Sequence, residues 1–518
     1  MKFNKSMLAI ALGATLGMGS VQAADITIAY AADPVTMDPN EQISTGVLQM
    51  SHLVFDSLVR FDNKLNPEAR LAKSWEQLDD KTMRFHLREG VKFHSGNTMT
   101  ADDVIFSYNR ISNSVDFKAI FAPYEKMVKV DDYTVDLISK EIYPLALANM
   151  SYLFILDQKF YTGLDDQGLP KDRIEKAKNT FAATHESGTG PFTYAYRQQG
   201  VKNVFEKFDD YWASRGNVDR ITLVPIKEDA TRVSALLSGD VDLINPVPPT
   251  DLQRVDENKN NLLYTIPSDR IIMVQMNEKV VPQFKDVRVR QAVVHAINNE
   301  GIAQKIMRGF ATPAGQASPD VYLGHDPKLV PRFDLKKARE LMKEAGYENG
   351  FTIDMISPNN RYVNDEKIAQ TVASMLAKIN IKVNLTTMPK AQYWPEFDKC
   401  ASGLQLIGWS SDTGDSANYS EFLTMTRNSD TGAGQYNCGF YSNTEVDSLI
   451  GEANKSVDSA KRAEFLQKIS DIEYKEAAFI PLHWQNHAWG YSNKLQNFPE
   501  IVNLKNFPHF GDLIVKEK

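Results

Sequence analysis

The sequence predicts a mixed α/β protein with more than one domain, and two observations lead to this prediction. Apolar residues alternate, as in strands, at 25–30, 82–87 and 132–138, and recur at helical spacing at 289–297 and 445–472. The 518 residues also exceed what one hydrophobic core usually organises. We find no internal repeat and no long Pro-, Gly- or Ser-rich linker. We therefore expect the domains to be joined by crossing strands and one domain to be discontinuous.

The first 23 residues have the pattern of a secretory signal peptide. Two lysines in MKFNK precede a largely apolar run from Met7 to Met18, and Val21-Gln22-Ala23 is a small-x-small cleavage site, so we expect cleavage after Ala23. No later segment reaches the roughly 18 uninterrupted apolar residues that a membrane helix needs. No cysteine lies beside the cleavage site, which argues against a lipid anchor. The mature protein is expected to be exported and not embedded in a membrane.

The charge of the chain is mildly acidic and evenly spread. The formal net charge of −8 becomes −10 when Lys2 and Lys5 leave with the signal peptide, and no block of like charge follows. Nucleic acids and anionic membranes select clustered Lys and Arg, so neither is an expected partner.

The chain has two cysteines, Cys400 and Cys438. In an oxidising compartment a disulfide is the expected state, and the chain-entropy account gives such a loop on the order of 4 kcal/mol of stability. Two unpaired thiols are the alternative. A disulfide would bracket the segment GWSSDTGDSANY at 408–419.

Residues 351–385 form the clearest strand–helix–strand pattern. The alternating positions are Phe351, Ile353 and Met355, then Ile381, Val383 and Leu385, and the helical positions between them are Ile368, Val372, Met375, Leu376 and Ile379. Asn364 is a plausible cap for the start of this helix.

Two strand ends carry opposite charges. One strand ends near Ile356 and leads into SPNNRY, which contains Arg361; another ends at Trp409 and leads into SSDTGD, which contains Asp412. Open α/β sheets bind ligands beyond the carboxyl ends of their strands. If both strands belong to one sheet, Arg361 and Asp412 project at the same edge, and a cation and an anion in one cleft suit a zwitterion.

Seven segments, in order, carry a family resemblance. They are PVTMDPN, LAKSWEQLDDKTMRFHLREGVKFHSG, TADDVIFSYNR, GTGPF, VRVRQAVVHAIN, ARELMKEAGY and FIPLHW. From Ala24 onward the chain resembles the periplasmic peptide-binding proteins of ABC transporters, particularly the dipeptide- and glutathione-type solute-binding proteins of family 5. The resemblance implies a two-lobed fold that closes on a ligand in the periplasm and delivers it to an inner-membrane permease, without catalysis, metal or cofactor. We expect a monomer.

The resemblance also implies ligand contacts. In dipeptide binders of this family, an aspartate after a GW strand end holds the α-ammonium group and an arginine after an earlier strand holds the carboxylate. The motifs GWSSD and NNRY give these roles to Asp412 and Arg361. Backbone groups near Gly408 and Trp409 would pair with the peptide in strand fashion, and Ser44-Thr45-Gly46 would contribute from the other lobe.

The implied three domains divide the chain unevenly. Domain I comprises 24–57, 188–270 and 490–518, domain II comprises 58–187, and domain III, the second ligand-binding lobe, comprises 271–489. Glutathione-type relatives often lack an acidic residue at the position of Asp412, so its presence favours α-peptides with a free amino terminus. Asp415 has no assigned role and is expected at most to order the loop.

Other functions remain as alternatives. A hydrolase is disfavoured because Gly-x-Ser-x-Gly and HExxH are both absent. A nickel or haem complex would use ligands such as His483 and His487, but these follow a strand-like FIPL and would lie about 13 Å apart along a strand. Glutathione is a further alternative, and oligosaccharide binding would use aromatic platforms, for which Trp394, Trp484 and Trp489 are candidates.

Overall fold

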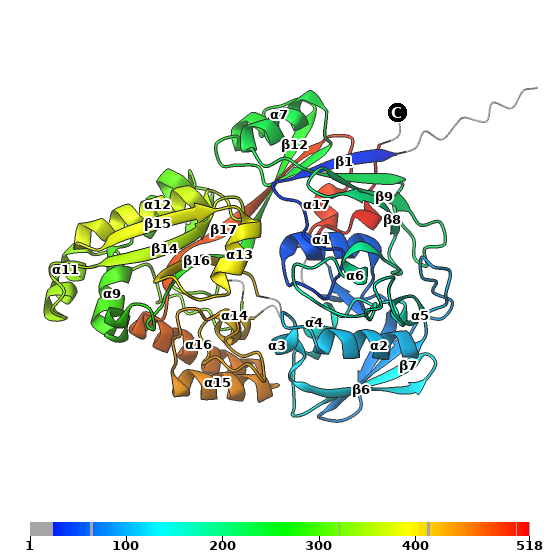
Figure 1. Cartoon of the computed structure of the whole chain (residues 1–518), viewed down its shortest axis with the longest axis horizontal. Coiled ribbons are helices and arrows are strands. Elements are labelled where there is room, and N and C mark those ends of the chain that lie inside the picture. Colours follow the sequence, from blue (N-terminus) through cyan, green and yellow to red (C-terminus); the bar gives the residue numbers. More distant parts are fainter. Residues whose placement is uncertain (1–23, 63–65, 321, 412–414, 504, 517–518) are drawn as a thin grey trace, which may run out of the picture.

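The computed structural model describes residues 24–62, 66–320, 322–411, 415–503 and 505–516. The predicted signal peptide and Asp412 lie outside the described residues. The described chain forms two lobes of mixed α/β structure (Figure 1). One lobe contains the helices of residues 287–296 and 335–476, and the other contains the helices of residues 45–184, so the predicted fold class and its two-lobed arrangement are confirmed.

The strands have the following bounds: β1 (Asp25–Tyr30), β2 (Val59–Phe61), β3 (Pro67–Ala69), β4 (Ala72–Gln77), β5 (Thr82–Leu87), β6 (Tyr124–Asp131), β7 (Thr134–Ser139), β8 (Phe192–Gln198), β9 (Lys202–Lys207), β10 (Arg220–Pro225), β11 (Leu243–Asn245), β12 (Asn261–Met276), β13 (Ala311–Pro313), β14 (Thr352–Pro358), β15 (Lys382–Met388), β16 (Leu404–Trp409) and β17 (Ile480–Ser492). The helices that matter most here are α1 (Thr45–Val54), α2 (Ala101–Ser112), α7 (Asp229–Ser238), α9 (Val287–Ala296), α11 (Leu335–Glu344), α12 (Asp365–Leu376), α13 (Lys390–Phe397), α14 (Ala417–Leu423), α15 (Thr444–Lys455) and α16 (Ser459–Glu476).

One large sheet runs through both lobes. Among the described residues it has eleven strands, in the order β15-β14-β16-β12-β17-β11-β1-β10-β9-β8, with β13 paired to β17. The long strands β12 and β17 pair antiparallel from Asn261↔Ser492 to Val274↔Ile480 and pass from one lobe to the other (Figure 1). The two lobes are therefore joined by crossing strands, as the absence of a linker predicted.

The pairing of β12 with β17 is interrupted where the strands cross between the lobes. The register shifts between Ile266 and Arg270, and the Ser268 hydroxyl there donates to the Gln485 carbonyl at 2.5 Å. A bulge re-aims the side chains that follow it. Arg270, the first residue after this bulge, lines the cavities between the lobes.

The predicted strand–helix–strand unit is present as β14, α12 and β15, with β14 and β15 parallel. Asn364 occupies the N-cap position of α12, but the capping role predicted for it is wrong. Its backbone is left-handed, with φ of 57°, and its side chain donates to the Ile306 carbonyl instead. The carboxylate of Asp365 accepts from the backbone N–H groups of Arg361, Tyr362 and Glu366.

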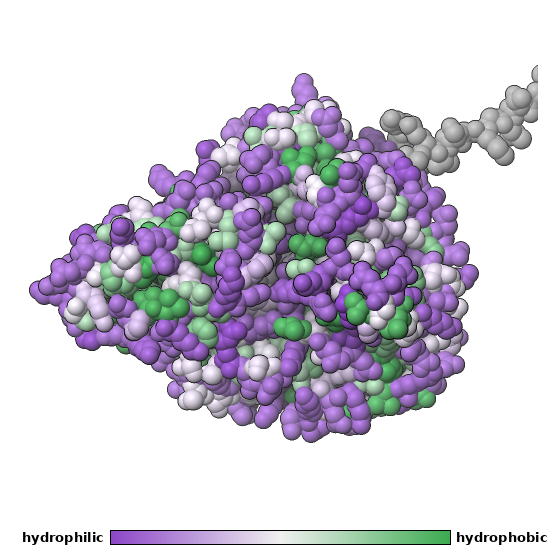
Figure 2. Space-filling model, in the orientation of Figure 1, coloured by the Kyte–Doolittle hydropathy of each residue, from purple (hydrophilic) through white to green (hydrophobic). Residues whose placement is uncertain are grey.

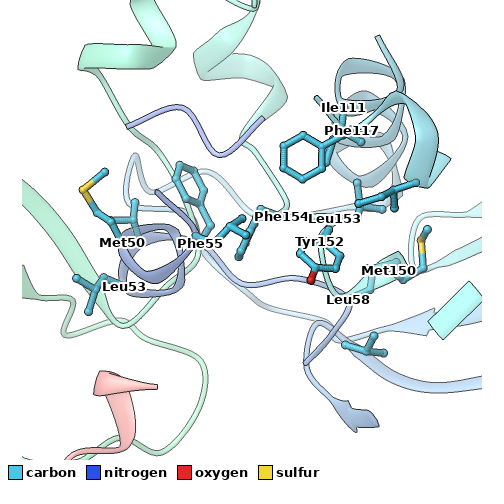
Figure 3. Close-up of a cluster of buried hydrophobic side chains, with 14 of the residues drawn as sticks. Met50, Leu53, Phe55, Leu58, Ile111, Phe117, Met150, Tyr152, Leu153 and Phe154 are labelled. Carbon is cyan, nitrogen blue, oxygen red and sulfur yellow. The ribbon is translucent and has the colours of Figure 1, made fainter. Parts of the chain in front are cut away.

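A second, four-stranded antiparallel sheet, β4-β5-β7-β6, lies apart from the large sheet. Its residues fall inside the range predicted for domain II, and the three-domain division stays a prediction. The core beside it includes Phe55, which follows the end of α1, and the segment around residues 150–154. Phe55 lies next to Phe154 (Figure 3), with the two ring centroids 6.4 Å apart. Phe55, Leu153 and Phe154 are each at most 1% exposed.

The surface in view is largely hydrophilic, with hydrophobic residues in small scattered groups (Figure 2). Among the residues that the structure describes, no helix combines the length and the apolar character needed to cross a membrane.

Candidate functional site

Two adjoining cavities lie between the lobes. The first is lined by Ser44, Thr45, Leu48, Tyr152, Lys176, Arg270, Arg361, Trp394, Gly408, Trp409, Ser410, Tyr436 and Phe507, among others. The second is lined by Tyr30, Asp33, Thr45, Gly46, Asn245, Arg270, Asn360, Arg361, Lys390, Gln485 and His487, among others. Thr45, Arg270 and Arg361 border both cavities and form their common wall.

Arg361 reaches this wall from the end of β14. Strands β14 and β16 are parallel neighbours, paired at Met355↔Leu404 and Ile356↔Gln405, so their carboxyl ends meet at one edge of the sheet. The condition set by the sequence, that the two strands share a sheet, is thus met. The Arg361 backbone N–H donates to the Asp365 carboxylate at 2.8 Å, which holds the loop. Burial raises the pKa of Asp365 to about 6.

The β16 end lies against the same loop. Gly408 and Trp409 line the first cavity, as do Ser410 and Ser411, which lead to the position of Asp412. The Tyr362 hydroxyl donates to the Gly408 carbonyl at 3.2 Å. A Cβ on Gly408 would lie 2.7 Å from Tyr362 Cε1 and 2.7 Å from Ile272 Cδ1, so this close approach requires glycine.

Trp409 packs in the core and also borders the first cavity. Its indole N–H donates to Asn418 Oδ1 at 2.8 Å, and its ring packs on Phe422 and Tyr436 with centroids 4.8 and 4.9 Å away. It is a core residue with one face on the cavity.

Ser44, Thr45 and Gly46 form the start of α1, on the other lobe. Thr45 Oγ1 accepts a hydrogen bond from the Arg270 guanidinium at 2.8 Å. The Ser44 hydroxyl is buried without a partner among the described residues. The first N–H groups of a helix have no intrahelical acceptor, so α1 presents donors to the cavity.

Two residues at the cavity wall were missed by the sequence analysis. Arg270 is 5% exposed, and burial, with the nearby Arg361, lowers its pKa to about 10. Lys390 begins α13, two residues after β15, and is 7% exposed; burial, then Arg361 and Arg270, lowers its pKa to about 7. Lys390 follows the end of a strand parallel to β14, so the rule that found Arg361 also applies to it.

The charges on the cavity walls are strongly unequal. Among the described lining residues, Lys176, Arg270, Arg361, Lys390 and Lys505 are basic, whereas the one acidic residue is Asp33. Asp33 already accepts from Arg197 at 3.1 Å and from Asn203 at 2.8 Å. Lys176 lies 3.2 Å from Asp116. The cleft therefore favours a ligand that carries negative charge.

Asp415 does not line either cavity. Its carboxylate lies 2.6 Å from the Arg462 guanidinium and accepts from the backbone N–H of Ala417 at 3.1 Å, and it is 5% exposed. These bonds hold Asp415 against α16 and the start of α14. Cys400 and Cys438 form a disulfide, which confirms the predicted pairing and closes the segment that contains β16.

His483 and His487 both lie on β17, a strand, as their position after FIPL predicted. Burial lowers the pKa of His483 to about 3. Burial, then Arg270 and Arg361, lowers the pKa of His487 as well, so both rings are neutral at ordinary pH. Within the described parts of the chain, no three His, Cys, Asp or Glu side chains are placed to share a metal ion.

The tryptophans do not form a shared platform. Trp394 lines the first cavity. The Trp484 indole N–H donates to the Ala317 carbonyl at 2.9 Å, and Trp489 is fully buried with its N–H on Asn506 Oδ1 at 2.6 Å.

Comparisons with known proteins agree with this architecture. Residues 66–431 match the family model of bacterial extracellular solute-binding proteins, family 5. The glutathione-binding protein GsiB of Escherichia coli O157:H7 is 29% identical over 503 residues, covering 94% of this chain and 95% of GsiB.

Solved structures share the fold over nearly the whole length. The periplasmic binding protein DppA of Helicobacter pylori, associated with an ABC transporter and in complex with the peptide STSA, aligns with a TM-score of 0.86 and 24% identity, covering 96% of this chain and 98% of DppA. MoaA of A. tumefaciens R10, in complex with mannopinic acid, aligns with a TM-score of 0.84 and 25% identity, covering 96% of this chain and 100% of MoaA.

Two lobes joined by crossing strands around a shared cavity, together with the family match, define a solute-binding protein. This chain belongs to the bacterial extracellular solute-binding proteins of family 5.

Proposed function

We propose that this protein is the periplasmic binding component of an ABC importer, that it captures short peptides, chiefly dipeptides, and that it delivers them to an inner-membrane permease without catalysing a reaction. The relatives described above are binding proteins, one of them associated with an ABC transporter. The observation that carries the proposal is the parallel pairing of β14 and β16, because it directs the Arg361 loop and the loop that begins at Ser410 to one edge, beside one cavity.

In this proposal Arg361 binds the ligand carboxylate and Asp412 binds the α-ammonium group. A planar guanidinium engages both carboxylate oxygens, and charge-assisted hydrogen bonds offset the water that both groups lose when the lobes close. Backbone groups at Gly408 and Trp409 pair with the peptide main chain, which permits many side chains. Ser44, Thr45 and Gly46 complete the site from the opposite lobe.

Binding both charged ends of the peptide also selects its length. Each extended residue adds at most about 3.6 Å, so an added residue misplaces one charged end by that distance.

Calorimetric titration with Ala-Ala tests the proposal. Asp412→Asn and Arg361→Ala are each expected to weaken binding by about 2–5 kcal/mol, the usual cost of stranding a buried charged partner. The matched controls are Asp209→Asn and Arg254→Ala, whose side chains are 81% and 54% exposed. N-acetylation of the ligand should weaken wild-type binding far more than binding to Asp412→Asn.

Unchanged affinity in either site variant would remove that residue from the site. Absence of binding by Ala-Ala and by other short peptides, neutral and acidic alike, would refute the proposed ligand class. Small-angle scattering should show a smaller radius of gyration at saturating ligand, because the lobes close by a hinge motion.

A further inference from the structure

Three cations at the cavity wall, Arg270, Arg361 and Lys390, form no ion pair with any carboxylate among the residues that the structure describes. Among the described residues, Arg270 forms one side-chain hydrogen bond, to Thr45 Oγ1, and Arg361 packs its guanidinium over the Tyr362 ring at 5.0 Å with Nε buried and unbonded. The Lys390 ammonium forms no hydrogen bond or ion pair with any described residue, although its backbone N–H donates to Asn360 Oδ1 at 2.7 Å. The residue is 7% exposed.

Burying a charge without a full partner is costly, and the lowered pKa values of Lys390 and Arg270 reflect this cost. Removing a charge from water without a partner disfavours the charged form, so a buried lysine or arginine loses its proton more easily. Burial, followed by the mutual repulsion with Arg361, lowers the pKa of both Lys390 and Arg270. Such perturbed groups in a cleft are typical of binding sites, where a ligand supplies the missing charge.

Among the described acidic groups, Asp33 lies near Lys390 and Asp269 lies near Arg270; each compensates its neighbouring cation in part, but neither forms an ion pair with it. Asp33 faces Lys390 in the second cavity, but its two oxygens are occupied by Arg197, Asn203 and the backbone N–H of Gly200. Asp269, next to Arg270, accepts from the Tyr322 hydroxyl and the Ser411 N–H on Oδ2, each at 2.9 Å.

The other side of the second cavity also suits an anion. Thr45 and Gly46 lie in the first turn of α1, a helix of ten residues, and both line this cavity. The unsatisfied N–H groups and the dipole of a helix N-terminus favour negative charge. Beside this helix end, the Arg270 side chain donates a hydrogen bond to Thr45 Oγ1 and lines the second cavity.

A zwitterionic ligand with a single carboxylate does not bring enough negative charge for all of these cations. In the proposed function, on which this inference rests, a dipeptide with neutral side chains brings one ammonium group for Asp412 and one carboxylate for Arg361. Arg270 and Lys390 would then close around the ligand without an anion. A second carboxylate on the ligand provides it.

We propose that the second cavity, between the start of α1 and the side chains of Arg270 and Lys390, binds a second carboxylate of the ligand, and that the preferred ligands are short peptides with two carboxylates. Two kinds of peptide present this chemistry: an α-linked dipeptide with an acidic side chain, and a γ-glutamyl peptide such as glutathione. Both carry one ammonium group and two carboxylates.

Titration calorimetry with Ala-Glu, Ala-Gln and reduced glutathione tests the inference. Ala-Glu and Ala-Gln have nearly the same shape and differ by one charge, so we expect wild type to bind Ala-Glu at least about tenfold more tightly. Equal affinities for Ala-Glu, Ala-Gln and glutathione would overturn the second carboxylate site and leave the proposed peptide binding standing. Failure of all three to bind would instead count against the proposed function itself.

The two kinds of peptide are separated by the same data. A preference for Ala-Glu over Ala-Gln assigns the second carboxylate to an acidic side chain. Tight binding of glutathione with equal, weak binding of the two dipeptides assigns it to a γ-linked peptide.

Lys390→Met is the decisive variant, because methionine keeps much of the length of the side chain and removes its charge. It should lower affinity for the dicarboxylic ligand by about tenfold or more and affinity for Ala-Gln by much less. Lys336→Met, at a lysine that is 88% exposed, is the matched control and should change neither. If Lys390→Met reduced both affinities equally, Lys390 would have no role specific to the second carboxylate.

Proton uptake is a second readout that does not depend on the variant folding well. A carboxylate placed beside Lys390 raises its pKa again, so binding at about pH 8.5 should take up nearly one proton. Calorimetry in two buffers of different ionisation enthalpy measures this uptake. Ala-Gln should show much less uptake than the dicarboxylic ligand, and equal uptake would contradict the site.

Discussion

The guanidinium of Arg270 donates a hydrogen bond of 2.8 Å to the hydroxyl of Thr45, although the two residues are 225 positions apart. Arg270 follows the bulge in β12, a strand that passes between the lobes, and Thr45 begins α1 on one lobe. The bond therefore ties the crossing strands to one wall of the ligand cavity, and it directs a buried cation into that cavity.

Replacement of Thr45 by valine should weaken ligand binding. Valine keeps the shape of threonine but cannot accept the bond from Arg270, and a hydrogen bond to a charged group contributes about 1.5–3 kcal/mol. Thr45→Ser keeps the hydroxyl and should bind nearly as tightly as wild type. Calorimetry on the two variants checks this, and equal losses in both would assign the effect to packing.

Gly408→Ala should disturb the site through Tyr362. The added methyl group would lie 2.7 Å from Tyr362 Cε1 and 2.7 Å from Ile272 Cδ1, so the ring and the Arg361 loop must shift. We expect a loss of about 1–3 kcal/mol in the free energy of unfolding, and weaker peptide binding. Gly451→Ala on α15 is the control, because a Cβ added there would meet no atom within 4 Å beyond the local helix backbone, and alanine should stabilise a helix slightly. Urea denaturation that shows the same small change in both variants would contradict the steric argument.

Lys390→Met should stabilise the unliganded protein, and this stabilisation should decrease as the pH rises. Lys390 faces Arg361, Arg270, Asp33, His487 and Tyr30, and its folded-state pKa of about 7 lies below the unfolded value of about 10.4. Between these values the unfolded state binds more protons, so wild-type stability rises with pH.

The gain from Lys390→Met should therefore be larger at about pH 6.5 than at about pH 9.5, by on the order of 3 kcal/mol. Denaturant titrations of both proteins at the two pH values measure the difference. A gain that is independent of pH would show that Lys390 titrates normally in the folded protein.

Glu473→Gln should stabilise the protein more at high pH than at low pH, which is the reverse of the pH dependence expected for Lys390→Met. The Glu473 carboxyl is buried on α16 and accepts from the hydroxyls of Ser420 at 2.7 Å and Thr424 at 2.5 Å, and burial raises its pKa to about 7. A raised carboxyl pKa contributes stability that is present below about pH 4 and is lost as the pH rises through about 7.

The free energy of unfolding of Glu473→Gln, relative to that of wild type, should increase by about 3 kcal/mol between about pH 4.5 and pH 8. The control is Glu464→Gln, an exposed position on the same helix. Parallel pH profiles of wild type and Glu473→Gln would exclude a raised pKa at this site.

The double variant Cys400→Ser, Cys438→Ser should lower stability by about 4 kcal/mol, because the disulfide closes a loop with a sequence separation of 38. Thermal unfolding of the variant should match that of reduced wild type. A variant as stable as the oxidised protein would mean that the folded packing around residues 400–438, and not the covalent link, holds this segment.

Much of the site was accessible from local sequence patterns because it follows strand ends. The alternation in β14 and the buried run of β16 indicated where each strand ends, and parallel neighbours place their carboxyl ends together. These local patterns therefore predict Arg361 at an edge of a sheet. Lys390 obeys the same rule at the end of β15.

Asp415 shows what such patterns cannot supply. Its position three residues after Asp412 suggested a loop role at most, and the partner that explains it, Arg462, lies 47 residues later on α16. Arg270 is a second example, since alternation along β12 does not reveal the bulge that turns this side chain toward the cavity.

The sequence by itself determined the alternation of helices and strands, the strand ends that carry Arg361, the expectation of a disulfide and the family resemblance, because each depends on residues that are close along the chain or on motifs in fixed order. The tertiary structure alone decided that Arg270, Lys390 and the start of α1 share one cavity, and that no described carboxylate forms an ion pair with either of those two cations. The physical reason is that charge balance in a cleft depends on distances through space, and these arise when distant segments fold together.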